Sequence, residues 1–142
     1  IEIAPERPIW TVRYMVTAGI ISSVCLIVAT AVLRPDKGNL PWILHTVGAA
    51  LFFLISLAVQ TRITYWLKHL AKRGVDIGRS LQQKFILVYA QWFFLGLMIV
   101  LQVADSDDRW KNVVEWWMAL LIGLYYLTSY RDWADFRLTE AE

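Results

Sequence analysis

The sequence has few of the residues on which secreted scaffolds and soluble enzymes depend. It contains one cysteine, Cys25, so no disulfide can form within the chain and a disulfide-rich scaffold is excluded. Only 18% of its 142 residues are Asp, Glu, Lys or Arg, and 58% are hydrophobic. Soluble domains usually have about 25% charged and about 45–50% apolar residues. The sequence also lacks a Gly-rich phosphate loop and a nucleophile elbow. Disorder and a Rossmann-type enzyme are therefore excluded too, and the composition indicates a membrane protein.

Charge is missing from four long stretches, which are residues 14–33, 40–61, 85–104 and 116–130. About 20 apolar residues in a helix span a hydrocarbon core of roughly 30 Å. The last stretch reaches that length only if it begins near Asn112, which takes Glu115 into the span. We therefore predict an all-α fold with one transmembrane domain over residues 1–142. It consists of an antiparallel four-helix bundle with spans at about 12–33, 40–66, 82–104 and 112–131.

Local signals refine this prediction. Asn39 is a candidate N-cap for the second helix, since its side chain can accept a hydrogen bond from the first turn. Small residues four positions apart, Gly19 with Ser23 and Ala119 with Gly123, permit close helix contacts, either within the bundle or with another subunit.

Basic residues are distributed unequally between the two sides of the predicted bundle. Ten lie on the side of both termini and of the loop at 67–81, and four lie on the other side. The positive-inside rule then predicts that the termini and this loop are cytoplasmic, or on the organellar equivalent side. This asymmetry explains the net charge of +2, so we expect no nucleic-acid partner. Five cations near the loop are candidate contacts for anionic lipid headgroups, with topology marking as the alternative: Lys68, Lys72, Arg73, Arg79 and Lys84.

Two ionisable residues, His45 and Glu115, fall inside the predicted spans and near the same membrane face. Such residues are costly in a membrane and are therefore candidate functional groups. They can form a structural pair that joins two helices, bind a lipid headgroup or transfer a proton, or never meet. A haem normally needs a second axial histidine, but His69 lies 24 residues further along the chain, about 36 Å away along a continuous helix. Recognisable metal-ligand spacings are also missing, so we expect no cofactor and no metal.

The polar positions of the spans resemble the DRAM/Frag/Sfk family, which includes the damage-regulated autophagy modulators. The resemblance covers nearly the whole chain. It is carried by four short motifs, Leu44-His45, Gln60 to Tyr65 (QTRITY), Glu115-Trp116 and Leu127 to Trp133 (LTSYRDW). It implies six spans with cytoplasmic termini, of which this chain looks like the last four. The family positions that it carries over are His45, Glu115, Trp116, Arg131 and Asp132.

The resemblance implies a regulatory function, because the family offers no catalytic residues to carry over. Members of the family act in autophagy, in phosphoinositide organisation or in remodelling of GPI-anchor lipids. We therefore expect a non-enzymatic membrane protein that organises membrane lipids or partner proteins. The alternatives are an accessory subunit of a large membrane complex, partnered by other membrane subunits, and a lipid-remodelling factor that uses His45 and Glu115.

Overall fold

The protein is all-helical. The computed structural model describes residues 9–31, 39–72, 78–104 and 107–139. They form four helices, α1 (Ile9–Ala31), α2 (Leu40–Ala71), α3 (Gly78–Val103) and α4 (Asp108–Thr139). This confirms the all-α fold class and the order of four helices. Most of the helices are longer than the predicted spans: α2 continues to residue 71, and α4 begins at 108 and continues to 139.

Two of the helix starts are defined by side-chain caps. The Asn39 Oδ1 atom accepts a hydrogen bond from the backbone N–H of Trp42 at 3.1 Å, so Asn39 is the N-cap that the sequence predicts. The Asp107 Oδ1 atom accepts one from the N–H of Arg109 at 3.0 Å. Asp108 follows in the first turn of α4, where the helix dipole favours an acidic residue.

Three of the helices contain segments long and apolar enough to cross a membrane: Arg13–Ala31, Leu40–Ala71 and Ser80–Val103. The part of α4 that the structure describes does not meet the same criterion of length and composition. Its charge-free stretch, residues 116–130, has only 15 residues. The crossing of the membrane by α4 therefore stays a prediction, whereas the multi-pass character rests on the other three helices.

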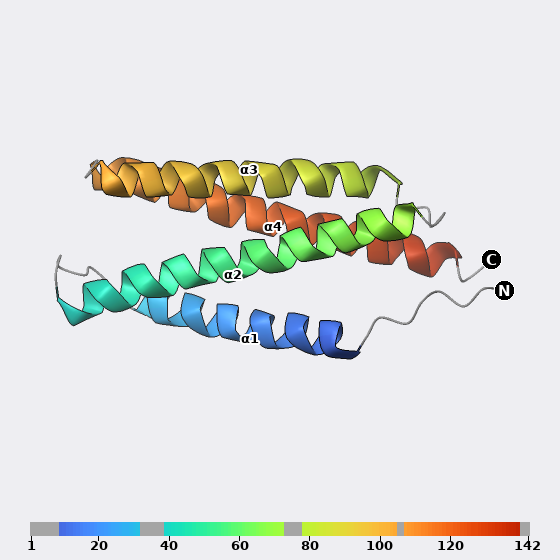
Figure 1. Ribbon diagram of the computed structural model, residues 1–142, viewed down its shortest axis with the longest axis horizontal. Coiled ribbons are helices and arrows are strands. Elements are labelled where there is room, and N and C mark those ends of the chain that lie inside the picture. The colour runs from blue at the N-terminus through green and yellow to red at the C-terminus, as the bar shows by residue number, and fades with distance from the viewer. Residues whose placement is uncertain (1–8, 32–38, 73–77, 105–106, 140–142) are drawn as a thin grey trace. The chain divides into compact units, whose positions relative to one another are not determined.

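The chain divides into two compact units, Ile1–Val59 and Gln60–Glu142, and the division falls within α2. In the first unit, α1 packs antiparallel to the first part of α2 (Figure 1). Ser22 and Ser56 share a buried hydrogen bond of 2.8 Å between their hydroxyl oxygens. Near Gly48 the two helices come so close that an added Cβ would lie 2.9 Å from the Cys25 carbonyl oxygen.

The close contact between helices is therefore at Gly48, and not at the small-residue pairs from which the sequence predicts one. A Cβ added at Gly19 or at Gly123 would meet nothing within 4 Å among the described residues. Close packing at Gly48 could not be deduced from residue spacing, because it depends on which side of α2 faces α1. Contact with another subunit stays the open alternative for Gly19 and Gly123.

In the second unit, the last three turns of α2 pack on α3 and α4, which run antiparallel to each other (Figure 1). Apolar side chains on one side of α3 and α4 form much of its core: Val88, Val114, Met118, Leu121, Ile122 and Tyr125. The rings of Phe94 and Trp117 stack between α3 and α4, with centroids 6.1 Å apart.

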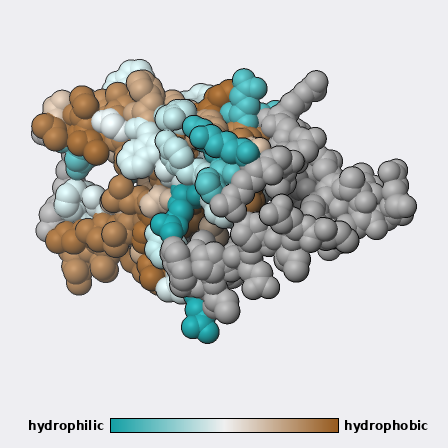
Figure 2. Space-filling model, turned by 45° about the vertical axis from the view of Figure 1, so that its right-hand side comes forward, coloured by the Kyte–Doolittle hydropathy of each residue, from teal (hydrophilic) through white to brown (hydrophobic). Residues whose placement is uncertain are grey.

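The outer surfaces of the helices are largely apolar. Large hydrophobic side chains are exposed on all four helices, among them Ile27, Leu51, Phe93 and Tyr126. Hydrophobic residues cover much of the described surface in Figure 2, and hydrophilic residues gather in a separate area. A surface of this kind is suited to contact with lipid or with apolar partner helices.

Candidate functional site

Polar side chains gather in the interior of the second unit, where a membrane bundle would otherwise be apolar. We call them the buried polar network, and its members are Gln60, Thr64, Lys84, Gln91, Tyr125 and Thr128. On each helix the members are three, four or seven residues apart, which places them on one face of that helix. Buried polar groups in a membrane are costly unless they are hydrogen-bonded, so their partners define what the network can do.

The contacts between α2 and α4 centre on the hydroxyl of Tyr125. This group donates to the backbone carbonyl of Gln60 at 3.1 Å and lies 3.0 Å from the Thr64 Oγ1 atom. The Thr64 hydroxyl also donates to the Gln60 carbonyl, at 2.8 Å. Each hydroxyl has one proton, so at most two of these three hydrogen bonds form at the same time. The cluster ties the two helices together through hydroxyl and backbone carbonyl groups.

The contacts between α3 and α4 centre on Lys84, which is only 1% exposed. Its Nζ atom donates to the Ser80 Oγ atom at 2.7 Å and to the Thr128 Oγ1 atom at 3.0 Å. The ammonium also lies 5.7 Å from the centre of the Tyr125 ring. Thr128 in turn donates to the Tyr125 carbonyl at 2.7 Å, so its hydroxyl proton is already used.

The burial of Lys84 differs from the expectation of an exposed cation that contacts lipid headgroups. The third helix begins at Gly78 and not near residue 82, which puts Lys84 in its second turn. Spacings of four and seven residues then place it on the same buried face as Val88 and Gln91. Hydropathy alone could not show this, because the start of α3 lies before its charge-free stretch.

The buried polar network joins α2 and α3 through a pair of carboxamides. Gln91 Nε2 donates to Gln60 Oε1 at 2.7 Å, and both residues are 0% exposed. The Gln60 Nε2 and Gln91 Oε1 atoms have no hydrogen-bond partner among the described residues. Turning both carboxamides over would also leave one donor and one acceptor without a partner. The pair therefore has the capacity to bind a further polar group such as a water molecule.

Aromatic rings and a lysine lie together on the surface near the C-terminal end of α2. The rings of Tyr65 and Phe85 meet edge to face at 5.6 Å, and Phe85 stacks on Tyr89 at 6.0 Å. Lys68 Nζ lies 5.3 Å from the Phe85 ring centre and 5.9 Å from that of Tyr65. Such an arrangement is typical of a membrane interface, where amphipathic rings meet cations.

The candidate headgroup contacts therefore have different surroundings. Lys68 and Lys72 are exposed, as such a contact requires, whereas Lys84 is enclosed. The side chains of Arg73 and Arg79 lie outside the described residues. Binding of a lipid headgroup by these cations stays a prediction.

The two ionisable residues predicted inside the spans belong to different units of the chain. The Nδ1 atom of half-buried His45 lies 2.7 Å from the Ala29 carbonyl oxygen. A carbonyl can only accept, so Nδ1 carries the proton and Nε2 is the acceptor in the neutral ring. Glu115 is half-buried in α4 of the second unit. Their pairing stays a prediction.

The remaining positions carried over by the resemblance lie on α4. Trp116 is largely exposed on its second or third turn. The side chains of Arg131 and Asp132 lie outside the described residues.

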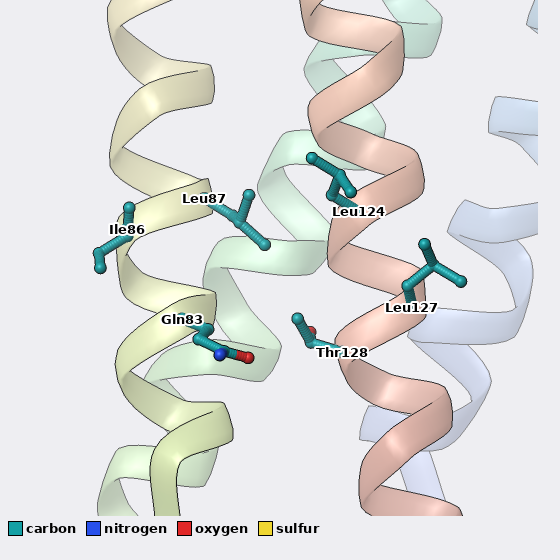
Figure 3. A pocket seen from close by; sticks show the side chains of 6 residues that line it. All are labelled: Gln83, Ile86, Leu87, Leu124, Leu127 and Thr128. Carbon is teal, nitrogen blue, oxygen red and sulfur yellow. The ribbon is translucent and has the colours of Figure 1, made fainter.

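A groove runs along the surface of α3 and α4. It has a volume of about 310 Å³. It is lined by Gln83, Ile86 and Leu87 of α3 and by Leu124, Leu127 and Thr128 of α4 (Figure 3). Because Thr128 accepts the hydrogen bond from Lys84, this groove lies against the buried polar network.

Sequence reasoning about ionisable residues missed most of this site. The motifs behind the family resemblance include Gln60, Thr64 and Thr128, but they gave these residues no role. The available signal was the four-residue spacing of Gln60 and Thr64 within an apolar helix, which places both on one face. Gln91 carries no comparable signal, because it is the single amide in the apolar stretch 85–101.

Comparison with known proteins supports the resemblance. Residues 4–136 match the family described as the Frag1/DRAM/Sfk1/Cwh43P N-terminal domain. No curated protein and no solved structure matches the chain.

Proposed function

The chain belongs to the Frag1/DRAM/Sfk1/Cwh43P N-terminal domain family, and we propose that it acts as a non-enzymatic multi-pass membrane protein that organises membrane lipids or partner proteins. Its expected contacts are lipids and other membrane protein subunits. We further propose that both termini and the 67–81 loop face the cytoplasm or its organellar equivalent, from the distribution of basic residues.

One observation carries this proposal: in the second unit a network of polar side chains is buried, whereas many large apolar side chains are exposed. The hydroxyls and amides of the buried polar network bond mainly to one another and to the backbone, which suits helix positioning more than chemistry on a substrate. The outward residues, such as Phe93, Val100 and Tyr126, are large and exposed. The surface that can act on other molecules is therefore apolar, and lipids and membrane helices are its natural partners.

The basic C-terminal end of α2 favours contact with anionic lipids. Lys68 and Lys72 are both exposed there. A basic residue close to the surface of an anionic membrane contributes about 1 kcal/mol of attraction. We therefore expect anionic lipids to gather at this end.

The test is gentle extraction of the full chain with its surrounding lipid into polymer-bounded nanodiscs. Lipid classes and co-purifying proteins are then quantified by mass spectrometry. We expect anionic lipids to be enriched over the bulk membrane. Enrichment should fall by up to about fivefold per lysine in Lys68→Gln and Lys72→Gln, and it should persist in the matched Lys68→Arg and Lys72→Arg variants. A lipid composition equal to the bulk membrane, together with no recovered protein partner, would refute the proposal.

Two further outcomes identify the alternatives. Recovery of the chain in fixed stoichiometry with a larger complex, without lipid enrichment, indicates an accessory subunit. Loss of a lipid-remodelling activity in His45→Ala and Glu115→Gln, with expression retained, indicates a remodelling factor. If both of these variants instead lose expression together, a structural pair is supported.

A further inference from the structure

The groove on α3 and α4 changes from polar to apolar along its length, as a lipid does. Gln83 and Thr128 form its polar end. Leu87 comes four residues after Gln83 in α3, and Leu124 comes four residues before Thr128 in the antiparallel α4. At 1.5 Å per residue, both leucines lie about 6 Å from the polar end in the same direction. In Figure 3, Gln83 and Thr128 lie at one level between the two helices, and Leu87 and Leu124 lie at the next. The polar end is the one nearer to Gly78, where α3 begins.

A buried lysine lies behind the polar end. The Lys84 ammonium donates a hydrogen bond of 3.0 Å to Thr128, which lines the groove. Lys84 is itself buried, and its hydrogen bond fixes the position of the Thr128 hydroxyl at the end of the groove. Gln83 is exposed and presents its carboxamide at the same level. Because Gln83 can donate a hydrogen bond, an occupant with a hydrogen-bond acceptor at this end is favoured.

The apolar end is open toward the side. Ile86 and Leu127, at its edges, are each 60% exposed. A volume of about 310 Å³ is at the low end of small-molecule pockets, which run from about 300 to 1,000 Å³. Such a space accommodates one hydrocarbon chain entering sideways from the bilayer and not a whole lipid.

We propose that this groove binds one acyl chain of a membrane glycerophospholipid. The acyl chain of the lipid lies along Leu87, Leu124 and Leu127, and the ester carbonyl of the lipid accepts a hydrogen bond from Gln83 Nε2. The headgroup lies at the polar end, on the side where α3 begins. This inference rests on the proposed role in organising lipids and assigns that role a site.

The test uses the full chain in phosphatidylcholine vesicles that contain a phosphatidylcholine with a photoreactive diazirine on one acyl chain. Labelled residues are mapped by mass spectrometry. We expect the label to concentrate on the groove residues. Leu124→Trp, which fills the groove, should reduce this labelling several-fold, whereas Leu120→Trp on the same helix but outside the groove should not. Gln83→Leu should reduce it by about fivefold, which corresponds to one hydrogen bond, and the neighbouring exposed Gln82→Leu should leave it unchanged.

An ether-linked probe isolates the predicted hydrogen bond, since it lacks the ester carbonyl. The ether probe should label the wild-type groove as weakly as the ester probe labels the groove of Gln83→Leu. The Gln83→Leu change should not reduce labelling by the ether probe any further. Because Gln83 is exposed, this comparison works even if the Leu124 variant fails to fold.

Even labelling of all exposed apolar residues, Phe93 and Val100 included, would overturn the proposal, because it indicates an ordinary lipid annulus. A cross-link through the groove to a second copy or to a partner helix would also overturn it. The extraction experiment separates this failure from that of the proposed function. If lipids are not enriched and no partner is recovered, but the groove is still labelled, only the proposed function is refuted. If lipids are enriched or a partner is recovered, but the groove is not labelled, only the groove is refuted.

Discussion

Replacing Gly48 by alanine is expected to weaken the packing of α1 on the first part of α2. The added Cβ would lie 2.9 Å from the Cys25 carbonyl oxygen and 3.2 Å from the Ala29 nitrogen. Both are backbone atoms of a helix and cannot rotate away. The two helices must therefore separate by a few tenths of an ångström.

The expected magnitude follows from three contributions. Overpacking of this kind costs about 1–3 kcal/mol. Separation also lengthens the 2.8 Å hydrogen bond between Ser22 and Ser56, and such a bond contributes about 0.5–1.5 kcal/mol. Alanine offsets up to about 1 kcal/mol through its higher helix propensity. We expect the free energy of unfolding of Gly48→Ala to fall by about 1–2 kcal/mol.

A matched control lies in the same unit. A Cβ at Gly19 in α1 would meet no atom of the described residues within 4 Å, so Gly19→Ala retains only the gain in helix propensity. The two variants make the same chemical change and should shift stability in opposite directions.

The assay is reversible unfolding of the full chain in detergent micelles by increasing fractions of denaturing detergent, followed by circular dichroism. Thermal unfolding provides an independent measure, in which 1 kcal/mol corresponds to about 2–4 °C for a chain of roughly this length. Equal stability changes in Gly48→Ala and Gly19→Ala would refute the reasoning, because the backbone contact at Gly48 would then have no energetic consequence.

Two further predictions concern the buried polar network. Tyr125→Phe removes the hydroxyl that donates to the Gln60 carbonyl and should lower the free energy of unfolding by about 1 kcal/mol, whereas Tyr126→Phe, with a 55% exposed ring, should change it by less than about 0.5 kcal/mol. Equal effects of the two changes in the same unfolding assay would contradict the assigned contact. Gln60→Leu and Gln91→Leu should each destabilise the chain by leaving the other carboxamide buried without its partner, and the double variant should lose about 1 kcal/mol less than the sum of the two. Strictly additive losses would show that the two amides do not interact.

Much of the fold could be predicted from the sequence, and the differences have identifiable causes. Charge-free stretches located all four helices, and Asn39 was the expected N-cap. Three of the four helices contain an apolar span of sufficient length. The predicted helix ends were less accurate, because helices continue beyond the apolar stretch that hydropathy detects. Lys84, a candidate headgroup contact near the start of the predicted third span, lies in the interior.

The candidate site was harder to predict than the fold. A rule based on ionisable residues selects His45 and Glu115, whereas the described contacts gather around glutamine, threonine and tyrosine. Neutral polar residues are common in membrane helices, so their presence alone does not indicate a site. Their significance appears only when Gln60 and Gln91 are found to share one hydrogen bond and to leave two groups without partners.

The sequence by itself determined that this protein is helical, membrane-embedded and a member of its family. The physical reason is that lipid cannot satisfy backbone hydrogen bonds, so long apolar stretches must form helices whatever their neighbours are. Only the tertiary structure decided that Gly48 marks a close helix contact, that Lys84 is enclosed by Ser80 and Thr128, and that α3 and α4 enclose a groove. These features depend on the rotation of each helix about its own axis, which is set by the packing of side chains from distant parts of the chain.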